Sequence, residues 1–270
     1  KEALDLYESL PNKSEASQRE YAKILYNRAQ ELLNDKKVSQ ANVLLIKAYK
    51  APNNSAVLPL VNFWLGEIAY NNGNYPSAIG YYKDYLAKPL TSGDVTVDNA
   101  RYNLAYSYLR SEDYNNAQKE FSTLQSKSLA SKQLNEDVTI RLADSYYMQK
   151  SFTNAASLYN KVISSNGIAG DYATFQTAMI DGALNKKTSK IEKLQSIDRN
   201  YTNSLLIPAS LMEIANVYLD DENYSNAVPY LNRIINNKSS SNLKPEALLK
   251  LGLAQYNLKK NDEALTTFKS

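Results

Sequence analysis

Small and large apolar residues recur at a fixed spacing along the chain. Six times, a Gly or Ala is followed twelve residues later by an alanine and four residues beyond that by a large apolar or aromatic residue. Residues three or four positions apart share one face of an α-helix, so each set predicts two amphipathic helices that cross at the small residues. The six sets are Ala29, Ala41 and Leu45; Gly66, Ala78 and Tyr82; Ala105, Ala117 and Phe121; Ala143, Ala155 and Tyr159; Ala215, Ala227 and Leu231; and Gly252, Ala264 and Phe268.

Proline and polar residues mark where these helices begin and end. Proline stands seven residues before the first small residue at Pro59, Pro208 and Pro245. It is tolerated at the start of a helix because its missing N–H would have no partner there. Polar segments such as 71–74 and 220–223 follow the first helix. Each repeat is therefore predicted to be an antiparallel pair, with a first helix of about fourteen residues, a polar turn and a second helix.

The distance between repeats predicts a single continuous array over residues 1–270. Successive first small residues lie 37, 39, 38, 72 and 37 positions apart, so the interval of 72 holds a degenerate repeat around Ala178. One pair cannot bury its apolar face alone, whereas stacked pairs share a continuous core. The predicted order is a half-repeat at 1–12, repeats at about 16–52, 58–90, 97–129 and 135–166, a degenerate repeat at 170–200, a repeat at 207–238 and a partial repeat at 244–270.

Two positions depart from this pattern. In the degenerate repeat Lys190 occupies the alanine slot, although Leu194 and Ile197 remain apolar behind it, so a looser helix crossing is expected there. Pro229 follows Ala227 by two residues inside a predicted helix. Proline in a helix interior removes a backbone hydrogen bond and clashes with the carbonyl four residues back. A late start or a kink is therefore expected in that helix.

The residues of the repeat at 97–129 carry a resemblance to a known family. The slots that they fill are Arg101, Leu104, Ala105, Tyr108, Ala117 and Phe121. This pattern resembles the tetratricopeptide repeat (TPR), although the leading Trp is missing and the period is longer than the usual 34 residues. The resemblance implies an all-α fold, a right-handed α-α superhelix (TPR-like solenoid) of antiparallel helix pairs. It also implies a scaffold that binds other proteins.

Composition limits the chemistry that is available. The chain has no His and no Cys, which removes the usual metal ligands, the thiol nucleophiles and the side chain best suited to proton transfer near neutral pH. Neither an enzyme activity nor a cofactor or metal is expected. A net charge of +3 without a basic run offers no footprint for nucleic acid. No apolar stretch approaches the length that crosses a bilayer, so direct membrane insertion is not expected either.

The resemblance places partner binding on the concave surface that the first helices line. In the family this surface is formed by the slots three before, one after and four after the first small residue. The residues chosen from these slots are Phe63, Glu67, Tyr70, Tyr102, Tyr106, Asp144, Tyr147 and Asn216. Tyrosine offers a large rigid contact area and a hydroxyl, which suits an extended peptide. Aromatic residues at helical spacing usually belong to the core, so packing stays open as the alternative for each of them.

The preferred function is a non-catalytic protein-protein interaction scaffold that binds a peptide or protein partner in the concave groove. Two alternatives stay open: a glycan- or peptidoglycan-binding helical module whose tyrosines stack on sugar rings, and the non-catalytic arm of a larger envelope enzyme. Long connections between repeats and the Asn-, Lys- and Tyr-rich composition resemble bacterial envelope arrays, so a periplasmic or outer-membrane-associated location is expected. The first residue, Lys1, and the half-repeats at both ends indicate a piece of a longer protein.

Overall fold

The computed structural model describes residues 2–9, 11, 14–127, 129, 131–237 and 242–270. Within these residues the regular elements are all α-helices, apart from one isolated antiparallel bridge between Ser92 and Val95. This confirms the predicted all-α class. The helices are α1 (Glu2–Ser9), α2 (Glu15–Asn34), α3 (Val38–Lys50), α4 (Leu58–Asn71), α5 (Tyr75–Ala87), α6 (Val97–Arg110), α7 (Tyr114–Gln125), α8 (Lys132–Met148), α9 (Phe152–Ser164), α10 (Gly170–Ala183), α11 (Lys187–Asn200), α12 (Ile207–Asp220), α13 (Tyr224–Asn236), α14 (Lys244–Asn257) and α15 (Asn261–Phe268).

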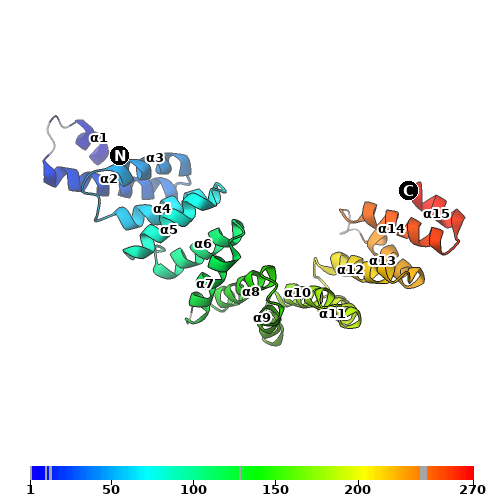
Figure 1. The fold of residues 1–270 in the computed structure, drawn as a ribbon. Helices are drawn as coiled ribbons and strands as arrows, with labels where there is room; N and C mark the ends of the chain where they lie inside the picture. Colours follow the sequence, from blue (N-terminus) through cyan, green and yellow to red (C-terminus); the bar gives the residue numbers. More distant parts are fainter. Residues whose placement is uncertain (1, 10, 12–13, 128, 130, 238–241) are drawn as a thin grey trace. The chain divides into compact units, whose positions relative to one another are not determined.

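The helices pack as consecutive pairs within two compact units. Unit 1 is Lys1–Ser131 and unit 2 is Lys132–Ser270. In unit 1, α2 packs on α3, α4 on α5 and α6 on α7, and each pair packs on the next through its second helix (Figure 1). In unit 2 the pairs are α8 with α9, α10 with α11, α12 with α13 and α14 with α15, stacked in the same way. The pairing predicted from the spacing is confirmed.

The small residues lie where the two helices of a pair meet. Ala105 on α6 and Ala117 on α7 are fully buried, and so is the Phe121 ring four residues beyond. In the α4–α5 pair, a Cβ atom on Gly66 would lie 2.8 Å from Cε1 of Tyr82, so the tyrosine ring fills the space that a side chain would need. The crossing is therefore closed by one large side chain packed over two small ones.

The same turn connects the two helices of each pair from α2–α3 to α14–α15. Seven residues after the first small residue, the backbone takes a left-handed conformation with φ between 55° and 74°. The N–H of the next residue then donates to the carbonyl five positions back, the pattern of a Schellman motif. The left-handed residues are Lys36, Gly73, Glu112, Lys150, Asn185, Glu222 and Lys259. A single member of this set is a glycine, although glycine alone lacks the Cβ that makes this conformation costly.

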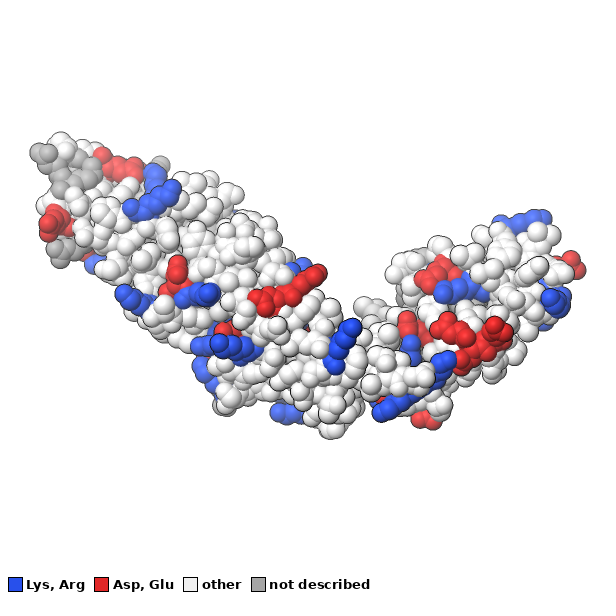
Figure 2. Space-filling view, in the orientation of Figure 1, with Lys and Arg blue, Asp and Glu red and all other residues white. Residues whose placement is uncertain are grey.

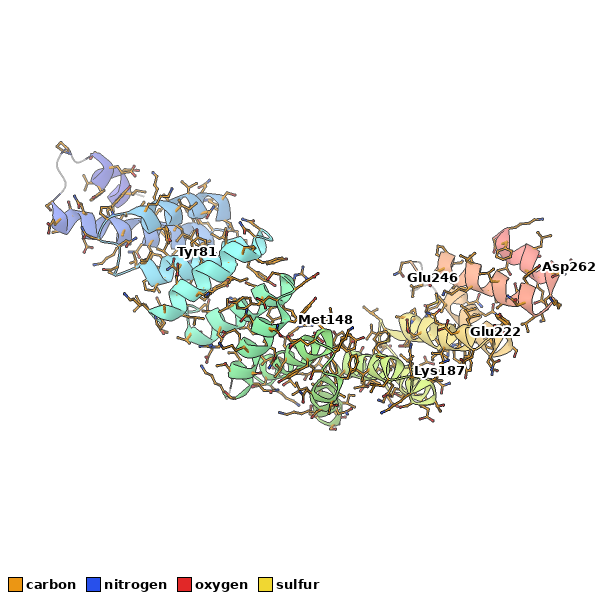
Figure 3. The ribbon with its side chains drawn as sticks, in the orientation of Figure 1. Tyr81, Met148, Lys187, Glu222, Glu246 and Asp262 are labelled. Carbon is orange, nitrogen blue, oxygen red and sulfur yellow. The ribbon has the colours of Figure 1, made fainter. Side chains whose placement is uncertain are left out.

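Replacing Glu222 with glycine is expected to stabilise unit 2. Glu222 is exposed at the α12–α13 turn and has a φ of 55° (Figure 3). Removal of its Cβ relieves the left-handed strain, and the free energy of unfolding should rise by about 0.5–1 kcal/mol in urea titrations followed by circular dichroism. Glu222→Ala is the control, because it removes the same charge and keeps the Cβ. An equal gain from both variants would show that charge, and not backbone strain, is the cause.

The degenerate repeat compensates for its lysine with a glycine. Lys190, at the alanine slot, is only 9% exposed, and its Nζ pairs with Glu213 of α12 at 2.6 Å. A Cβ atom on Gly182 would lie 3.0 Å from Cδ of Lys190, so the lysine stem occupies the space beside this glycine. The other repeats carry a large side chain at the position of Gly182, for example Leu219 in α12. The larger side chain at position 190 is therefore matched by a smaller residue at position 182, and the crossing that was expected to be loose is filled.

The proline in α13 does not delay the helix. α13 begins at Tyr224, nine residues after Ala215, which is the phase of the other second helices, so the expected late start is wrong. The Asn223 side chain accepts a hydrogen bond from the Asn226 N–H at 3.4 Å and caps the helix. Pro229 lies on the exposed side, where its ring faces solvent. Capping and burial of the opposite face hold the helix together across the missing backbone hydrogen bond.

Candidate functional site

Phe63, one of the predicted partner-binding residues, lies in the core. Its side chain is 3% exposed, and its ring packs edge-on against Trp64, Tyr82 and Tyr85 with centroids 5.5, 6.1 and 5.7 Å away. Such a side chain offers no surface to a partner in this conformation. Phe63 therefore has a packing role in this pair, with its ring turned towards Tyr82 and Tyr85 of the second helix, and its part in partner binding stays a prediction.

Glu67, Asp144 and Asn216 share the slot one residue after the first small residue, and each joins neighbouring helices by hydrogen bonds. Glu67 Oε1 accepts from the Tyr82 hydroxyl at 2.6 Å and from the Asn103 amide of the next pair. Asn216 Oδ1 accepts from Lys250 Nζ of the next pair at 2.8 Å. These polar side chains are half-buried and tie each pair to its neighbour, a role that the sequence analysis did not foresee.

Burial raises the pKa of the Glu67 carboxyl above its usual value of 4.5, against the opposing effect of the hydrogen bonds from Tyr82 and Asn103. A carboxyl with a raised pKa holds its proton more tightly in the folded chain, so stability present below the usual pKa is lost as the pH rises through the raised value. Glu67→Gln keeps an acceptor oxygen and cannot ionise. It should raise the free energy of unfolding of unit 1 near neutral pH and change it little below about pH 4.

Urea titrations at both pH values test this prediction, with Glu112→Gln at an exposed turn of the same unit as the control. A change of equal size at both pH values would contradict it, since only the ionised form of Glu67 is disfavoured by burial.

The predicted tyrosines lie half-buried on the first helices and contact other rings. Tyr102 and Tyr106 of α6 lie 4.8 Å apart, and both pack against Phe121, at 6.5 and 5.5 Å. The remaining two, one in each unit, contact the first residue of the following second helix: Tyr70 lies 5.6 Å from Tyr75, and Tyr147 lies 5.8 Å from Phe152. Each of these four tyrosines therefore combines a packing contact with a partly exposed surface.

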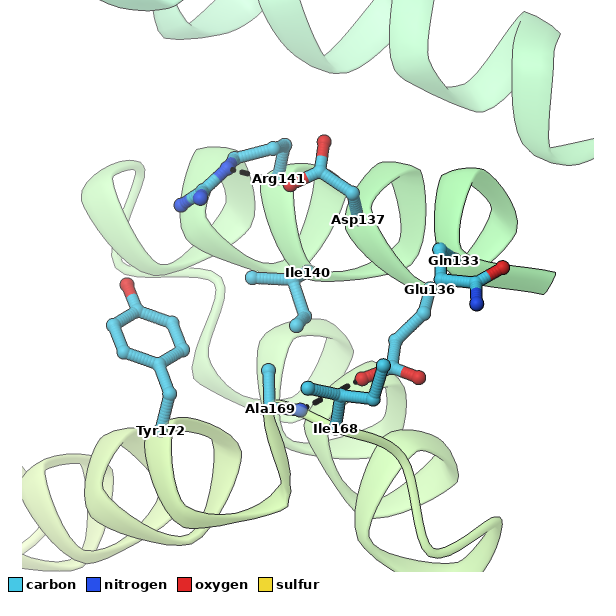
Figure 4. Close-up of a pocket in the computed structure, with 8 residues that line it drawn as sticks. All are labelled: Gln133, Glu136, Asp137, Ile140, Arg141, Ile168, Ala169 and Tyr172. Atoms are coloured by element: carbon cyan, nitrogen blue, oxygen red, sulfur yellow. Dashed lines mark hydrogen bonds and ion pairs between the residues drawn. The ribbon is translucent and has the colours of Figure 1, made fainter. Parts of the chain in front are cut away.

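A pocket lies between the first helices of two successive pairs in unit 2. Its volume is about 380 Å³, and it includes Ile140, which occupies one of the slots assigned to the concave surface (Figure 4). The complete lining is Gln133, Glu136, Asp137, Ile140, Arg141, Ile168, Ala169 and Tyr172. We refer to it as the α8–α10 pocket. A hollow of about 650 Å³ in unit 1, around Tyr49, Asn54 and Asp84, is lined by residues of α3, α4 and α5 and of the connections that follow α3 and α5.

Next to the pocket, the Asp144 carboxylate is surrounded by three hydrogen-bonding partners. Its carboxylate accepts hydrogen bonds from the hydroxyls of Tyr159 at 2.6 Å and Tyr172 at 2.9 Å, and it pairs with Arg141 Nη1 at 2.9 Å. Burial and the nearby Asp144 charge raise the pKa of Tyr159 and Tyr172 well above the usual value, so both hydroxyls stay protonated and donate. This predicted binding residue therefore holds the wall of the pocket.

The rim of this pocket was not predicted from the sequence. Ile168 lies in the segment between two glycines that connects α9 to α10, and its side chain is 81% exposed. The repeat pattern contains no rule for the connections, so the residues that they bring to the groove could not be selected. An apolar residue in a connection otherwise rich in Gly, Ser and Asn was the available signal.

Charged side chains are distributed over the surface without a dominant sign. On the face shown in Figure 2, lysine and arginine alternate with aspartate and glutamate, and much of the surface is uncharged. Among the described residues no group of three or more His, Cys, Asp or Glu is arranged to hold a metal ion. None of the helices described combines the length and the apolar character of a membrane span.

Stacked antiparallel pairs that cross at small residues define an α-solenoid built from helical hairpins. A profile of the tetratricopeptide repeat matches residues 26–94 and 102–171, more than half of the chain, and a second profile of the same description matches residues 246–270. The chain belongs to the tetratricopeptide repeat family. The repeats of this family generally mediate protein-protein interactions, and its members are generally non-catalytic scaffolds.

Solved structures show the same fold at low sequence identity. A tetratricopeptide repeat protein from Parabacteroides merdae is similar with a TM-score of 0.61 and 12% identity, over 93% of this chain and 91% of that protein. The apo form of RapI has a TM-score of 0.61 and 15% identity, over 92% of this chain and 74% of RapI. PilF of Pseudomonas aeruginosa has a TM-score of 0.53 and 13% identity, over 85% of this chain and 99% of PilF. No curated protein sequence matches the chain.

Proposed function

We propose that this chain is a non-catalytic scaffold that binds a peptide or protein partner along its first helices, with the α8–α10 pocket as one point of attachment. The observation that carries the proposal is a pocket of about 380 Å³ between two first helices, with the side chain of Ile168 81% exposed at its rim. Exposed apolar side chains beside a pocket are typical of interaction sites.

The half-buried tyrosines support the same reading in unit 1. Tyr102 and Tyr106 are packed against Phe121, which limits their freedom before binding, so contact with a partner costs them little side-chain entropy. Glu67, Asp144 and Asn216 contribute indirectly, because their hydrogen bonds hold the first helices in place.

Photo-crosslinking in the native cell tests the proposal. Benzoylphenylalanine in place of Ile168 should capture one discrete partner protein. The same residue in place of Lys161, which is exposed on the second helix α9, should not capture that partner. Identical adducts from both positions, or none from Ile168, would contradict the proposal.

We also propose a bacterial envelope location on the periplasmic side, which the long connections between repeats and the Asn-, Lys- and Tyr-rich composition support. Cell fractionation with an antibody against the chain would test it. Recovery in the cytoplasmic fraction would contradict it.

A further inference from the structure

The α8–α10 pocket combines an apolar interior with carboxylates at its edge. Ile140 points from α8 towards Ile168 in the connection, and Tyr172 of α10 lies to the side (Figure 4). Glu136 and Asp137 lie four and three residues before Ile140 on α8, about one helical turn away, and both are half-buried. The lining contains two carboxylates and one guanidinium, and the Asp144 carboxylate lies directly behind them. The pocket therefore has a net negative charge beside an apolar wall.

Glu136 is committed to holding the connection before α10. Its Oε1 accepts a hydrogen bond from the backbone N–H of Ala169 at 2.8 Å. A Cβ atom on Gly167 would lie 2.7 Å from the same carboxyl group, so the glycine leaves room for this carboxylate where the chain passes over it. This carboxylate positions Ile168 at the rim, and it is not the group that an incoming ligand would engage most easily.

Asp137 is the carboxylate that can accept a second cation. Its Oδ1 lies 3.4 Å from Nε of Arg141, whereas Asp144 lies 2.9 Å from Nη1 of the same guanidinium. The Asp137 side chain is 29% exposed, compared with 14% for Asp144. When Asp137 turns towards a ligand, Arg141 keeps its shorter and more buried partner, Asp144.

We infer that the α8–α10 pocket accepts a lysine or arginine side chain of the partner, an inference that rests on the proposed function of the groove. Such a side chain has an apolar stem and a cationic end, which match the two surfaces of the pocket. The stem lies against Ile140, Ile168 and the Tyr172 ring, and the cation reaches Asp137. The ring of Tyr172 adds cation-π attraction, because its hydroxyl donates to Asp144 and directs electron density into the ring.

Methyl NMR of the whole chain with labelled isoleucines tests this inference. The probes are three amidated heptapeptides, Gly-Gly-Leu-X-Leu-Gly-Gly, in which X is Lys, Gln or Glu. At about 1 mM, the Lys peptide should shift the methyl signals of Ile140 and Ile168 and leave those of Ile214 and Ile234, which are buried elsewhere in unit 2, unchanged. The Asp137→Asn substitution should lower the affinity of the chain for the Lys peptide about two- to fivefold and leave its affinity for the Gln peptide unchanged. Asp220→Asn, at an exposed turn of unit 2, is the matched control and should change neither.

The outcomes separate this inference from the proposed function. Shifts of both methyls by the Gln or Glu peptide, but not by the Lys peptide, would overturn the cation assignment and support a peptide groove. Equal affinities of the Lys peptide for the unaltered chain and the Asp137→Asn variant would overturn it as well. Absence of shifts with all three peptides would also overturn it, while a partner crosslinked at Ile168 would still support the groove.

Discussion

Lys190→Ala should lower the free energy of unfolding of unit 2 by about 1–3 kcal/mol, and Gly182→Leu in the same chain should restore most of it. The single substitution removes a lysine stem packed beside Gly182 and leaves Glu213 without its cation partner. Gly182→Leu alone should also destabilise, since its Cβ would lie 3.0 Å from Cδ of Lys190. Together the two changes recreate the arrangement of α12 and α13, where Leu219 stands four residues after the first small residue and Ala227 fills the alanine slot.

A double-mutant cycle measures the coupling free energy between positions 182 and 190. Urea unfolding of the chain and hydrogen exchange in α10 and α11 should show a favourable coupling of about 1–3 kcal/mol between the two positions. Lys187→Ala is the matched control, because Lys187 lies on the same helix and pairs with Asp221 on the surface (Figure 3). It should show no coupling with Gly182→Leu. Additive effects of Lys190→Ala and Gly182→Leu would contradict the idea that the glycine accommodates the lysine.

Tyr159→Ala should be the most destabilising of the changes considered, at about 3–5 kcal/mol. The ring is fully buried between α8 and α9, and it meets Tyr172 edge-on with centroids 6.3 Å apart. Its hydroxyl donates to Asp144 at 2.6 Å, so the alanine variant combines a cavity with a lost hydrogen bond at a half-buried carboxylate. The damage should appear first as faster hydrogen exchange in α8 to α10, because each repeat contacts only its neighbours.

Two variants separate the contributions to this loss. Tyr159→Phe keeps the ring and should cost about 1 kcal/mol, since Asp144 retains Tyr172 and Arg141 as partners. Tyr256→Ala removes the same side chain where it is 60% exposed on α14, and should change stability by about 0.5 kcal/mol or less. A cost for Tyr159→Ala as small as that of Tyr256→Ala would show that the α8–α9 crossing does not depend on this ring.

Local spacing in the sequence was sufficient to predict the helices, their pairing and the family. Small residues such as Ala105 and Ala117, twelve positions apart, indicate which faces meet, because the helical period alone sets the direction of each side chain. The helical period did not predict that α13 would begin at Tyr224 despite Pro229. The buried face of α13 and the Asn223 cap stabilise the helix by more than the single missing hydrogen bond costs.

Only the tertiary structure decided what the polar residues do. Glu67 meets Asn103, Asn216 meets Lys250 and Glu136 meets the N–H of Ala169, contacts that span 33 to 36 positions and therefore join successive repeats. A slot in one repeat specifies the direction of a side chain and says nothing about what the next repeat presents to it. For that reason the sequence determined the repeating helical frame, whereas the stacking of repeats decided which carboxylates bridge helices and where the α8–α10 pocket opens.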